Sequence, residues 1–280
     1  LVDAELENPP VENVDFLYLR LRRLSPSGDL LEESILEDAP EDGELRFYSV
    51  EDGNVEFEVV SDLNYQDRPI LTKTSLVELT FKDGNLFLMA YTYGVKVYSL
   101  SSELEVQWDI QVMPAYSYLW TSSLQNFSKL SIADNGEVFV AFELFGPDVD
   151  IYNAHFGRSR SLADGQKGIN IDVLNTSGEY QRGFMIDDPS YSEVLVGIQL
   201  YDQSLWMVSN VRREKENATG GTTEWDILFQ QISPDNGSIV YERIIHLDQE
   251  DVALSFVRAT NQNFILGGIN GFSQVDTNSQ

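Results

Sequence analysis

Apolar and polar positions alternate along this chain in a repeated pattern of paired segments. One kind of pair joins two strongly apolar runs through a tight polar turn, as in LVELTF-KDGN-LFLMAY (76–91), LSI-ADNG-EVFVAF (130–142) and VLVGIQL-YDQ-SLWMVS (194–209). The other kind is more polar and has an apolar residue at every second position, as in 95–110, 169–184 and 227–244. Period-two alternation bounded by short turns predicts antiparallel β-hairpins. Because the two kinds take turns, we expect one repeated four-stranded unit with an inner and an outer pair.

The turns between the apolar runs favour tight hairpins. Asp83-Gly84, Asp52-Gly53 and Asn135-Gly136 supply residue types that accept the positive φ angles of short hairpin loops. Helical periodicity is almost absent, and the best helix candidate is a short stretch around 159–165. The pattern therefore predicts an all-β protein.

The repeat divides the chain into complete and incomplete units. Complete four-strand units are expected at 76–112, 128–186 and 193–246. The first part of the chain is less regular: 14–37 has the pattern of an outer pair, 45–62 of an inner pair, and 68–74 of a weakly marked outer part. The chain ends with an inner pair at 252–269 and one further strand at 271–276. The two ends thus complement each other.

Complementary ends predict how the repeat closes. A ring of blades avoids long exposed edges when its first and last strands share one blade. We therefore predict a single β-propeller domain over 14–280, with about five four-stranded antiparallel blades closed by pairing of the N- and C-terminal strands. Six or seven blades, or a β-sandwich, are the alternatives. Residues 1–13 are acidic, contain a proline pair and lack periodicity, which predicts an N-terminal tether.

Two outer hairpins carry a resemblance to a known family. VYSLSSELEVQW (97–108) and DVLNTSGEYQRGF (172–184) resemble those of bacterial β-propeller repeat proteins of the quinoprotein-like and lipoprotein types. Such hairpins run apolar–x–apolar, then a polar turn often with Ser/Thr-Gly, then an aromatic residue. The first hairpin departs from this pattern because it has Glu103-Leu104 where a glycine is usual. The resemblance covers fragments of the chain and implies the propeller fold, but it does not imply a quinone cofactor.

Composition narrows the partners and the compartment. The net charge of −28, from 46 acidic and 18 basic residues, repels phosphate backbones and argues against nucleic acid. The acids are spread along the chain, which indicates a solvated acidic surface or, alternatively, a Ca²⁺-dependent one. The absence of cysteine excludes disulfides and thiolate chemistry. We expect an extracellular, periplasmic or cell-surface protein without a transmembrane segment, with an export signal or lipid anchor upstream of Leu1.

Two long insertions interrupt the repeat. Residues 145–168 and 211–224 each join the second and third strands of a unit, and the aromatic segment 113–123 joins two units. In an up-and-down repeat these connections all leave the same face, where binding usually occurs. The insertions also hold a third of the basic residues, including Lys167 and Lys215. The predicted ligand-binding residues are Tyr116, Tyr118, Trp120, Arg158, Arg160, Arg212 and Arg213. The alternative is that these bases offset nearby acids and the aromatic residues cover a blade junction.

Other candidate chemistry is weak. Asp148 and Asp150 are spaced to present two carboxylates to one cation such as Ca²⁺, although no DxDxDG loop follows. His155 and His246 lack metal-site spacing, so we expect each to be hydrogen-bonded or at the surface. There is no GxSxG elbow. Inner-strand acids that a propeller glycosidase would need are few: Glu78, Glu143 and Asp62.

The sequence gives no positive reason for an enzyme and no cofactor. The leading hypothesis is an exported, non-enzymatic β-propeller that binds a protein or carbohydrate partner through the face bearing the insertions. One alternative is a glycan-processing hydrolase of the five-bladed propeller type. Another is an envelope scaffold lipoprotein that binds through exposed blade edges.

Overall fold

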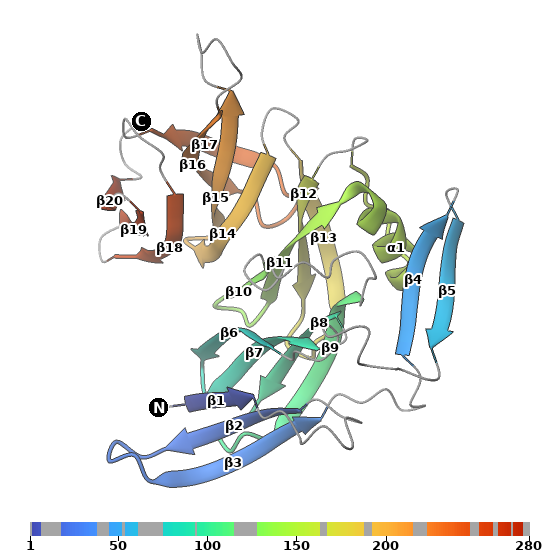
Figure 1. Ribbon diagram of the computed structural model, residues 1–280. Helices are drawn as coiled ribbons and strands as arrows, with labels where there is room; N and C mark the ends of the chain where they lie inside the picture. The colour runs from blue at the N-terminus through green and yellow to red at the C-terminus, as the bar shows by residue number, and fades with distance from the viewer. Residues whose placement is uncertain are drawn as a thin grey trace. The chain divides into compact units, whose positions relative to one another are not determined.

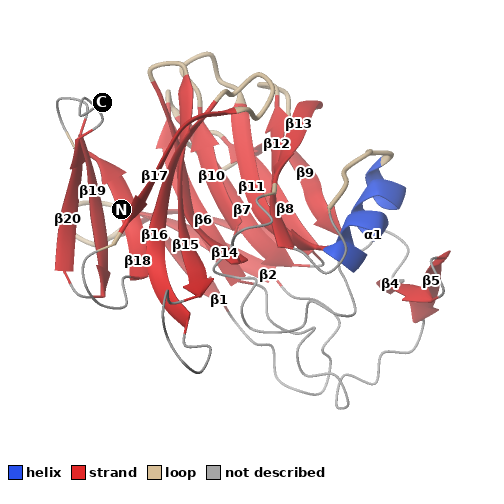
Figure 2. Ribbon diagram, turned by 90° about the horizontal axis from the view of Figure 1, so that it is seen from above, coloured by secondary structure: helices blue, strands red, loops and turns tan. Residues whose placement is uncertain are grey.

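The computed structural model describes most of the chain as β-strands (Figures 1 and 2). The described residues are 2–6, 18–37, 45–51, 54–60, 75–92, 94–114, 128–162, 167–187, 192–214, 223–246, 252–259, 263–269 and 271–276. Among them one helix, α1 (Gly146–Phe156), interrupts the strands, and it is too short and polar to cross a membrane. The chain forms two compact units: residues 1–125, 150–159 and 177–179 in the first, and 126–149, 160–176 and 180–280 in the second.

The first unit contains three antiparallel sheets. Their strands follow sequence order: β1-β2-β3, β4-β5 and β6-β7-β8-β9. Leu21 of β2 packs with Leu86, Leu88 and Leu100 of the four-stranded sheet. The strands are β1 (Val2–Leu6), β2 (Tyr18–Leu24), β3 (Leu30–Glu37), β4 (Leu45–Glu51), β5 (Asn54–Val60), β6 (Ser75–Lys82), β7 (Asn85–Thr92), β8 (Gly94–Leu100) and β9 (Val106–Pro114).

The second unit also contains three antiparallel sheets in sequence order: β10-β11-β12-β13, β14-β15-β16-β17 and β18-β19-β20 (Figure 1). The first strands lie next to one another, since β14 contacts both β10 and β18. Sequential four-stranded sheets that pack through their first strands are blades of a β-propeller. The strands are β10 (Ser128–Ile132), β11 (Val138–Phe145), β12 (Lys167–Leu174), β13 (Tyr180–Ile186), β14 (Ser192–Tyr201), β15 (Ser204–Glu214), β16 (Thr223–Ile232), β17 (Ile239–Ile245), β18 (Val252–Arg258), β19 (Asn263–Ile269) and β20 (Gly271–Asp276).

Sheet β14–β17 has a packed interface on each of its faces. We call its interface with sheet β10–β13 the first seam; its apolar centre includes Phe139, Ile171, Phe184, Leu195 and Met207. We call its interface with sheet β18–β20 the second seam. The apolar centre of the second seam is rich in aromatic rings and includes Trp206, Phe229, Phe256, Phe264 and Leu266.

Most of the predicted elements are confirmed. The units expected at 76–112, 128–186 and 193–246 are the three four-stranded sheets, 45–62 contains the pair β4-β5, and 252–276 contains β18 to β20. The all-β class and the four-stranded antiparallel blades are therefore confirmed. Residues 68–74 lie outside the described residues. Within the segment predicted as a tether, β1 pairs with β2. Ring closure through the terminal strands stays a prediction.

The turns follow the predicted chemistry with two differences. Asp83 and Gly84 both have positive φ, as a two-residue hairpin loop requires, whereas of the pair Asn135-Gly136 the glycine alone does. Residues 52–53 lie outside the described residues. Leu104 also has positive φ (60°), and its side chain is 3% exposed in the core of the first unit. Burial thus compensates for the missing glycine in that outer hairpin.

The helix prediction was wrong in position. The helix occupies 146–156, at the start of the insertion, while described residues 159–162 have no regular structure. Gly157, with φ of 63°, ends it. The helix lacks a strongly amphipathic pattern, so no clear helical periodicity marks its position in the sequence.

Candidate functional site

The two long insertions leave the same edge of the second unit. The first connects β11 to β12 and the second connects β15 to β16, which confirms that each joins the second and third strands of its sheet. Because all these strands are antiparallel and in sequence order, the connections β13–β14 and β17–β18 leave that edge too. We call it the insertion edge. The short turns β10–β11, β12–β13, β14–β15 and β16–β17 lie at the opposite end of the strands, the turn edge.

The second insertion is shorter than its sequence pattern suggests. Strand β15 continues to Glu214 and β16 begins at Thr223, and these two residues are paired. Arg212 and Arg213 therefore lie in β15 rather than in a loop, opposite Trp225 and Glu224. The Arg212 side chain is exposed. The connection between the paired ends is thus 215–222, which includes Lys215 and lies outside the described residues.

Of the remaining predicted ligand-binding residues, the structure describes Arg158 and Arg160. Tyr116, Tyr118 and Trp120 lie outside the described residues. Arg158 follows α1, is half-buried, and donates its backbone N–H to the Asn153 carbonyl over 3.1 Å. The role of these residues in ligand binding stays a prediction.

Arg160 is held against the sheet instead of facing solvent. Its Nε donates to Asn170 Oδ1 over 2.7 Å, and its Nη2 lies 3.0 Å from Asp172 Oδ1 and 3.2 Å from the Tyr180 hydroxyl. The Arg160 side chain is 10% exposed and that of Asp172 5%. A Cβ at Gly183 would collide with this guanidinium, so glycine makes the room for it. Arg160 thus anchors the end of the first insertion to β12 and β13.

A second buried group joins the base of the same insertion to the neighbouring sheet. Glu143, near the end of β11, has no exposed surface and pairs with Lys167, the first residue of β12. Its Oε1 accepts the backbone N–H of Leu195, on β14, over 2.6 Å. Burial raises the pKa of Glu143 to about 7, although Lys167 and the Leu195 N–H both act to lower it. One carboxyl group therefore connects both stems of the insertion to the next blade.

Further buried polar residues face the first seam from sheet β14–β17. Leu195 belongs to that seam, so Glu193, two residues earlier on the same strand, lies on the same face. Asp226 lies on this face too, because its neighbour Ile227 packs in the second seam. Glu193 is 5% exposed and Asp226 1%. Asp226 Oδ1 lies 2.6 Å from His246 Nδ1, which confirms a hydrogen-bonded histidine.

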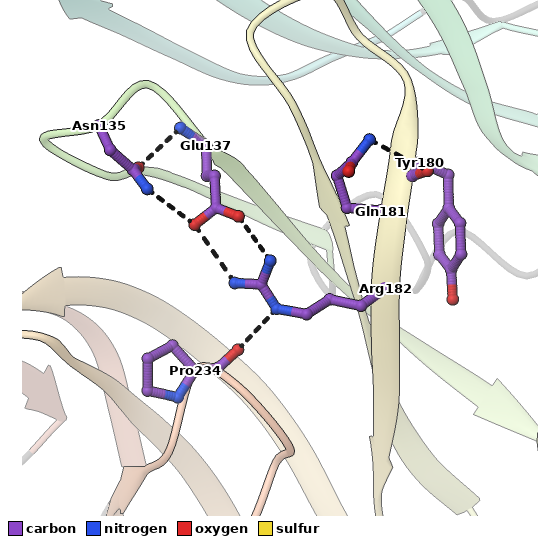
Figure 3. A network of polar contacts seen from close by, with 6 residues as sticks. All are labelled: Asn135, Glu137, Tyr180, Gln181, Arg182 and Pro234. Atoms are coloured by element: carbon purple, nitrogen blue, oxygen red, sulfur yellow. Dashed lines mark hydrogen bonds and ion pairs between the residues drawn. The ribbon is translucent and has the colours of Figure 1, made fainter.

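The turn edge of the first seam has a different polar network (Figure 3). Arg182 of β13 makes two hydrogen bonds to the Glu137 carboxylate, at 2.5 and 3.2 Å, and donates from Nε to the Pro234 carbonyl over 3.2 Å. Asn135 also donates to Glu137. The hydrogen bonds from Arg182 hold the pKa of Glu137 below its usual range, and Glu137 raises the pKa of Arg182. Because Pro234 belongs to the β16–β17 turn, the network ties the two sheets together.

The second seam is joined by an amide instead of by charges. Asn210 of β15 donates from Nδ2 to the Ala253 carbonyl over 2.9 Å and accepts the Ala253 N–H over 2.7 Å. Asn210 is 6% exposed. At the turn edge, Arg258 stacks 3.4 Å from the centre of the Tyr201 ring. This seam therefore contains no buried carboxylate among the contacts described.

The residues of the predicted metal site both lie in the helix of the first insertion. Asp148 and Asp150 belong to α1. Asp150 is exposed. No group of three or more potential metal ligands converges in the described part of the chain. Ca²⁺ binding stays a prediction.

The acids proposed for a hydrolase do not form a described catalytic pair. Glu78 is half-buried on β6 beside a register shift, and Asp62 lies outside the described residues. Glu143 belongs to the other unit and is buried between two sheets. The hydrolase alternative draws no support from these positions.

The buried polar residues of these sheets carry only a weak local signal in the sequence. Glu143 is a charged residue inside the apolar run VFVAFELF, which is the signal of a partnered buried group. Glu193, Asp226 and Asn210 likewise interrupt apolar strands. The partners of Asp226 and Asn210, however, lie on other strands and could not be read from local sequence.

No family model matches the chain, and no curated protein matches it. Among solved structures, the β-propeller domain of Cps50 (Swd1) from Myceliophthora thermophila matches with a TM-score of 0.42 and 8% identity, over 94% of this chain and 80% of that one. A protein of unknown function from Bacteroides caccae matches with a TM-score of 0.34 and 12% identity, over 92% of this chain and 86% of that one. Drosophila Plexin A, in complex with Semaphorin 1b, matches with a TM-score of 0.41 and 11% identity, over 97% of this chain and 52% of that one. Likeness at this level says nothing about activity or ligand.

Proposed function

We propose that this protein is an exported, non-enzymatic β-propeller that binds a protein or carbohydrate partner through its insertion edge. The observation that carries the proposal is that both long insertions join second to third strands in adjacent sheets and so leave the same edge. Long connections on a rigid sheet scaffold are where binding residues concentrate. Export and a surface location are part of the proposal, supported by the acidic composition and the lack of cysteine.

The bases of both insertions are firmly held, which favours binding over a passive role as linkers. The first is anchored by Arg160 to β12 and β13 and by Glu143 and Lys167 to the next sheet. The second rises from the paired residues Glu214 and Thr223. A preorganised base lowers the entropy lost when a loop binds a partner. Arg212, exposed at the end of β15, is the best placed of the predicted basic residues to meet a partner.

The decisive variant replaces 215–222 with Asn-Gly and leaves the paired ends of β15 and β16 intact. This exchange is milder than removal of 211–224, which would delete paired strand residues. The matched control changes Asp202-Gln203 to Asn-Gly at the turn edge of the same sheet, where both residues already have positive φ. A second variant, Arg212→Glu, reverses one exposed charge without shortening the chain.

The probes are a glycan array and a phage-displayed peptide library, with each hit purified and its Kd remeasured by biolayer interferometry. We expect the 215–222 exchange to weaken binding at least tenfold and the turn control to leave it unchanged. Hits that bind the loop exchange and Arg212→Glu as well as wild type would contradict the proposal. Val240→Lys tests the scaffold alternative, because Val240 is 63% exposed on the edge strand β17. Loss of binding in that variant alone would favour binding through blade edges.

A further inference from the structure

Glu143 and Lys167 stand at the two stems of the first insertion and also at the end of the first seam. Glu143 comes three residues before α1 begins, and Lys167 is where β12 resumes. The carboxyl group accepts the Leu195 N–H from the neighbouring sheet over 2.6 Å. Its full burial means that water cannot reach it while the two sheets stay packed. Any change in its charge is therefore felt by both sheets at the base of the insertion.

The charged and apolar groups at this end of the first seam come from several strands. From its own sheet, β12 contributes the Lys167 ammonium and the apolar Ile169, and β13 contributes Ile186, followed by exposed Asp187. From the opposite sheet, β14 contributes Glu193, β15 contributes Val211 in register with it, and β16 and β17 contribute the pair Asp226 and His246. Buried acids thus outnumber the bases around this end of the seam.

We propose that Glu143 is the proton-linked latch of the first seam: the sheets stay closed at the base of the insertion while it holds a proton, and open there more often once it is ionised. In the closed state an ionised Glu143 would lie buried without water between the two sheets, with Lys167 as its cation. In the open state water would solvate the carboxylate. Ionisation therefore favours opening.

The size of the effect follows from the difference between the two states. An open state gives Glu143 the ordinary carboxyl pKa of 4.5, whereas burial in the closed state raises the pKa to about 7. The equilibrium constant for opening should then rise by about thirtyfold between about pH 5.5 and about pH 8.5. Opening at neutral and alkaline pH would loosen the base of the first insertion.

Hydrogen exchange of two backbone amides measures the latch directly. The Leu195 N–H donates to the titrating carboxyl group of Glu143, and the Ala253 N–H donates to the amide oxygen of Asn210, which does not titrate. Both amides lie on sheets of the second unit and at its insertion edge. We expect the protection factor of Leu195, corrected for intrinsic exchange, to fall about thirtyfold across this pH range. That of Ala253 should change less than threefold.

Two variants separate this latch from other titrations, including that of His246. Glu143→Gln keeps an acceptor for Leu195 but cannot ionise, so the Leu195 protection factor should lose its pH dependence. Lys167→Met removes the cation that lowers the pKa of Glu143, so the midpoint of the transition should move to higher pH. If Glu143→Gln does not fold, the two amides of the wild-type protein still decide the matter. A constant Leu195 protection factor, a parallel fall at Ala253, or an unchanged slope in Glu143→Gln would each overturn the proposal.

The idea that this latch controls partner binding rests on the proposed function. The hydrogen-exchange experiment, however, needs no partner. A failure of the glycan and peptide probes would therefore leave the latch measurable. If partners are found, their Kd in wild type should depend on pH over the same range, and in Glu143→Gln it should not.

Discussion

The two faces of sheet β14–β17 are packed by different chemistry. On one face, the first seam has a mostly aliphatic centre with charged groups at both ends: Glu143 and Lys167 at the insertion edge, Arg182 and Glu137 at the turn edge. On the other face, the second seam has a cluster of aromatic rings and an amide link through Asn210. The second seam is stabilised by apolar burial, while in the first seam a few specific bonds fix how the two sheets are oriented.

This difference indicates a division of labour between the seams. Buried charges cost desolvation energy, so they are weak evidence for stability and are retained where they fix geometry or respond to conditions. In this protein they lie in the seam whose insertion is the longer one. The second seam has no such buried ion pair among its described residues, so its stability should depend mainly on apolar packing.

The largest expected effect is in the second seam. Phe264 has no exposed surface, and its ring centre lies 5.2 Å from that of Trp206 and 5.3 Å from that of Phe229. Phe264→Ala should lower the free energy of unfolding by about 3–5 kcal/mol, measured by urea denaturation. The matched control is Val257→Ala, on the opposite face of the same sheet and 57% exposed, which should cost less than about 1 kcal/mol. A small effect of Phe264→Ala would mean that this cluster is not a cooperative core.

The next effect is the pH dependence of the first seam. The pKa of Glu143 is higher in the folded state, at about 7, than the usual 4.5, so the folded protein holds the proton more tightly. Its contribution to stability is therefore full below pH 4.5 and is lost as the pH rises through about 7. The free energy of unfolding of Glu143→Gln, taken relative to that of wild type, should therefore rise by about 3 kcal/mol between these limits. Urea denaturation at a series of pH values measures it.

A carboxyl group introduced into the second seam tests whether that seam, too, can be made sensitive to pH. Asn210→Asp retains an acceptor for the Ala253 N–H but, once ionised, sets a second oxygen against the Ala253 carbonyl. The variant should become less stable as the pH rises, while wild type shows no such dependence at this site. If Asn210→Asp is insensitive to pH and Glu143→Gln leaves the wild-type slope unchanged, the chemical contrast between the seams has no consequence for stability.

Much of this architecture could be predicted from the sequence, because it depends on local patterns. The hairpins, their order and the placement of both insertions followed from period-two alternation and from turns such as Asp83-Gly84. The extent of β15 could not be predicted, because Arg212 and Arg213 are polar residues whose strand conformation depends on pairing with β16. Tertiary context decides such cases.

The candidate site was harder to predict, because the charge of a residue does not show whether its side chain faces solvent or pairs with a buried acid. Arg160 and Lys167 belong to the same predicted basic group as Arg212, yet they pair with Asp172 and Glu143. A basic residue in an insertion has the same local signal whether it faces solvent or turns back onto a sheet. The distinction lies in partners such as Leu195, which is 52 residues away from Glu143 in the chain.

The smallest expected effect is at the turn edge of the first seam, and it has the opposite dependence on pH. The Arg182 side chain is 30% exposed and that of Glu137 24%, so Arg182→Met should cost only about 1 kcal/mol in urea denaturation at pH 7. Arg22→Met, which breaks the ion pair with Glu33 in the first unit, is the control and should cost less. Because the pKa of Glu137 is lowered in the folded state, its contribution is present above pH 4.5 and is lost on acidification. Low pH should therefore weaken the contacts at the turn edge, whereas high pH should weaken those at the insertion edge. A cost of Arg182→Met that grows as the pH falls below 4.5 would contradict this, since protonated Glu137 no longer pairs with Arg182.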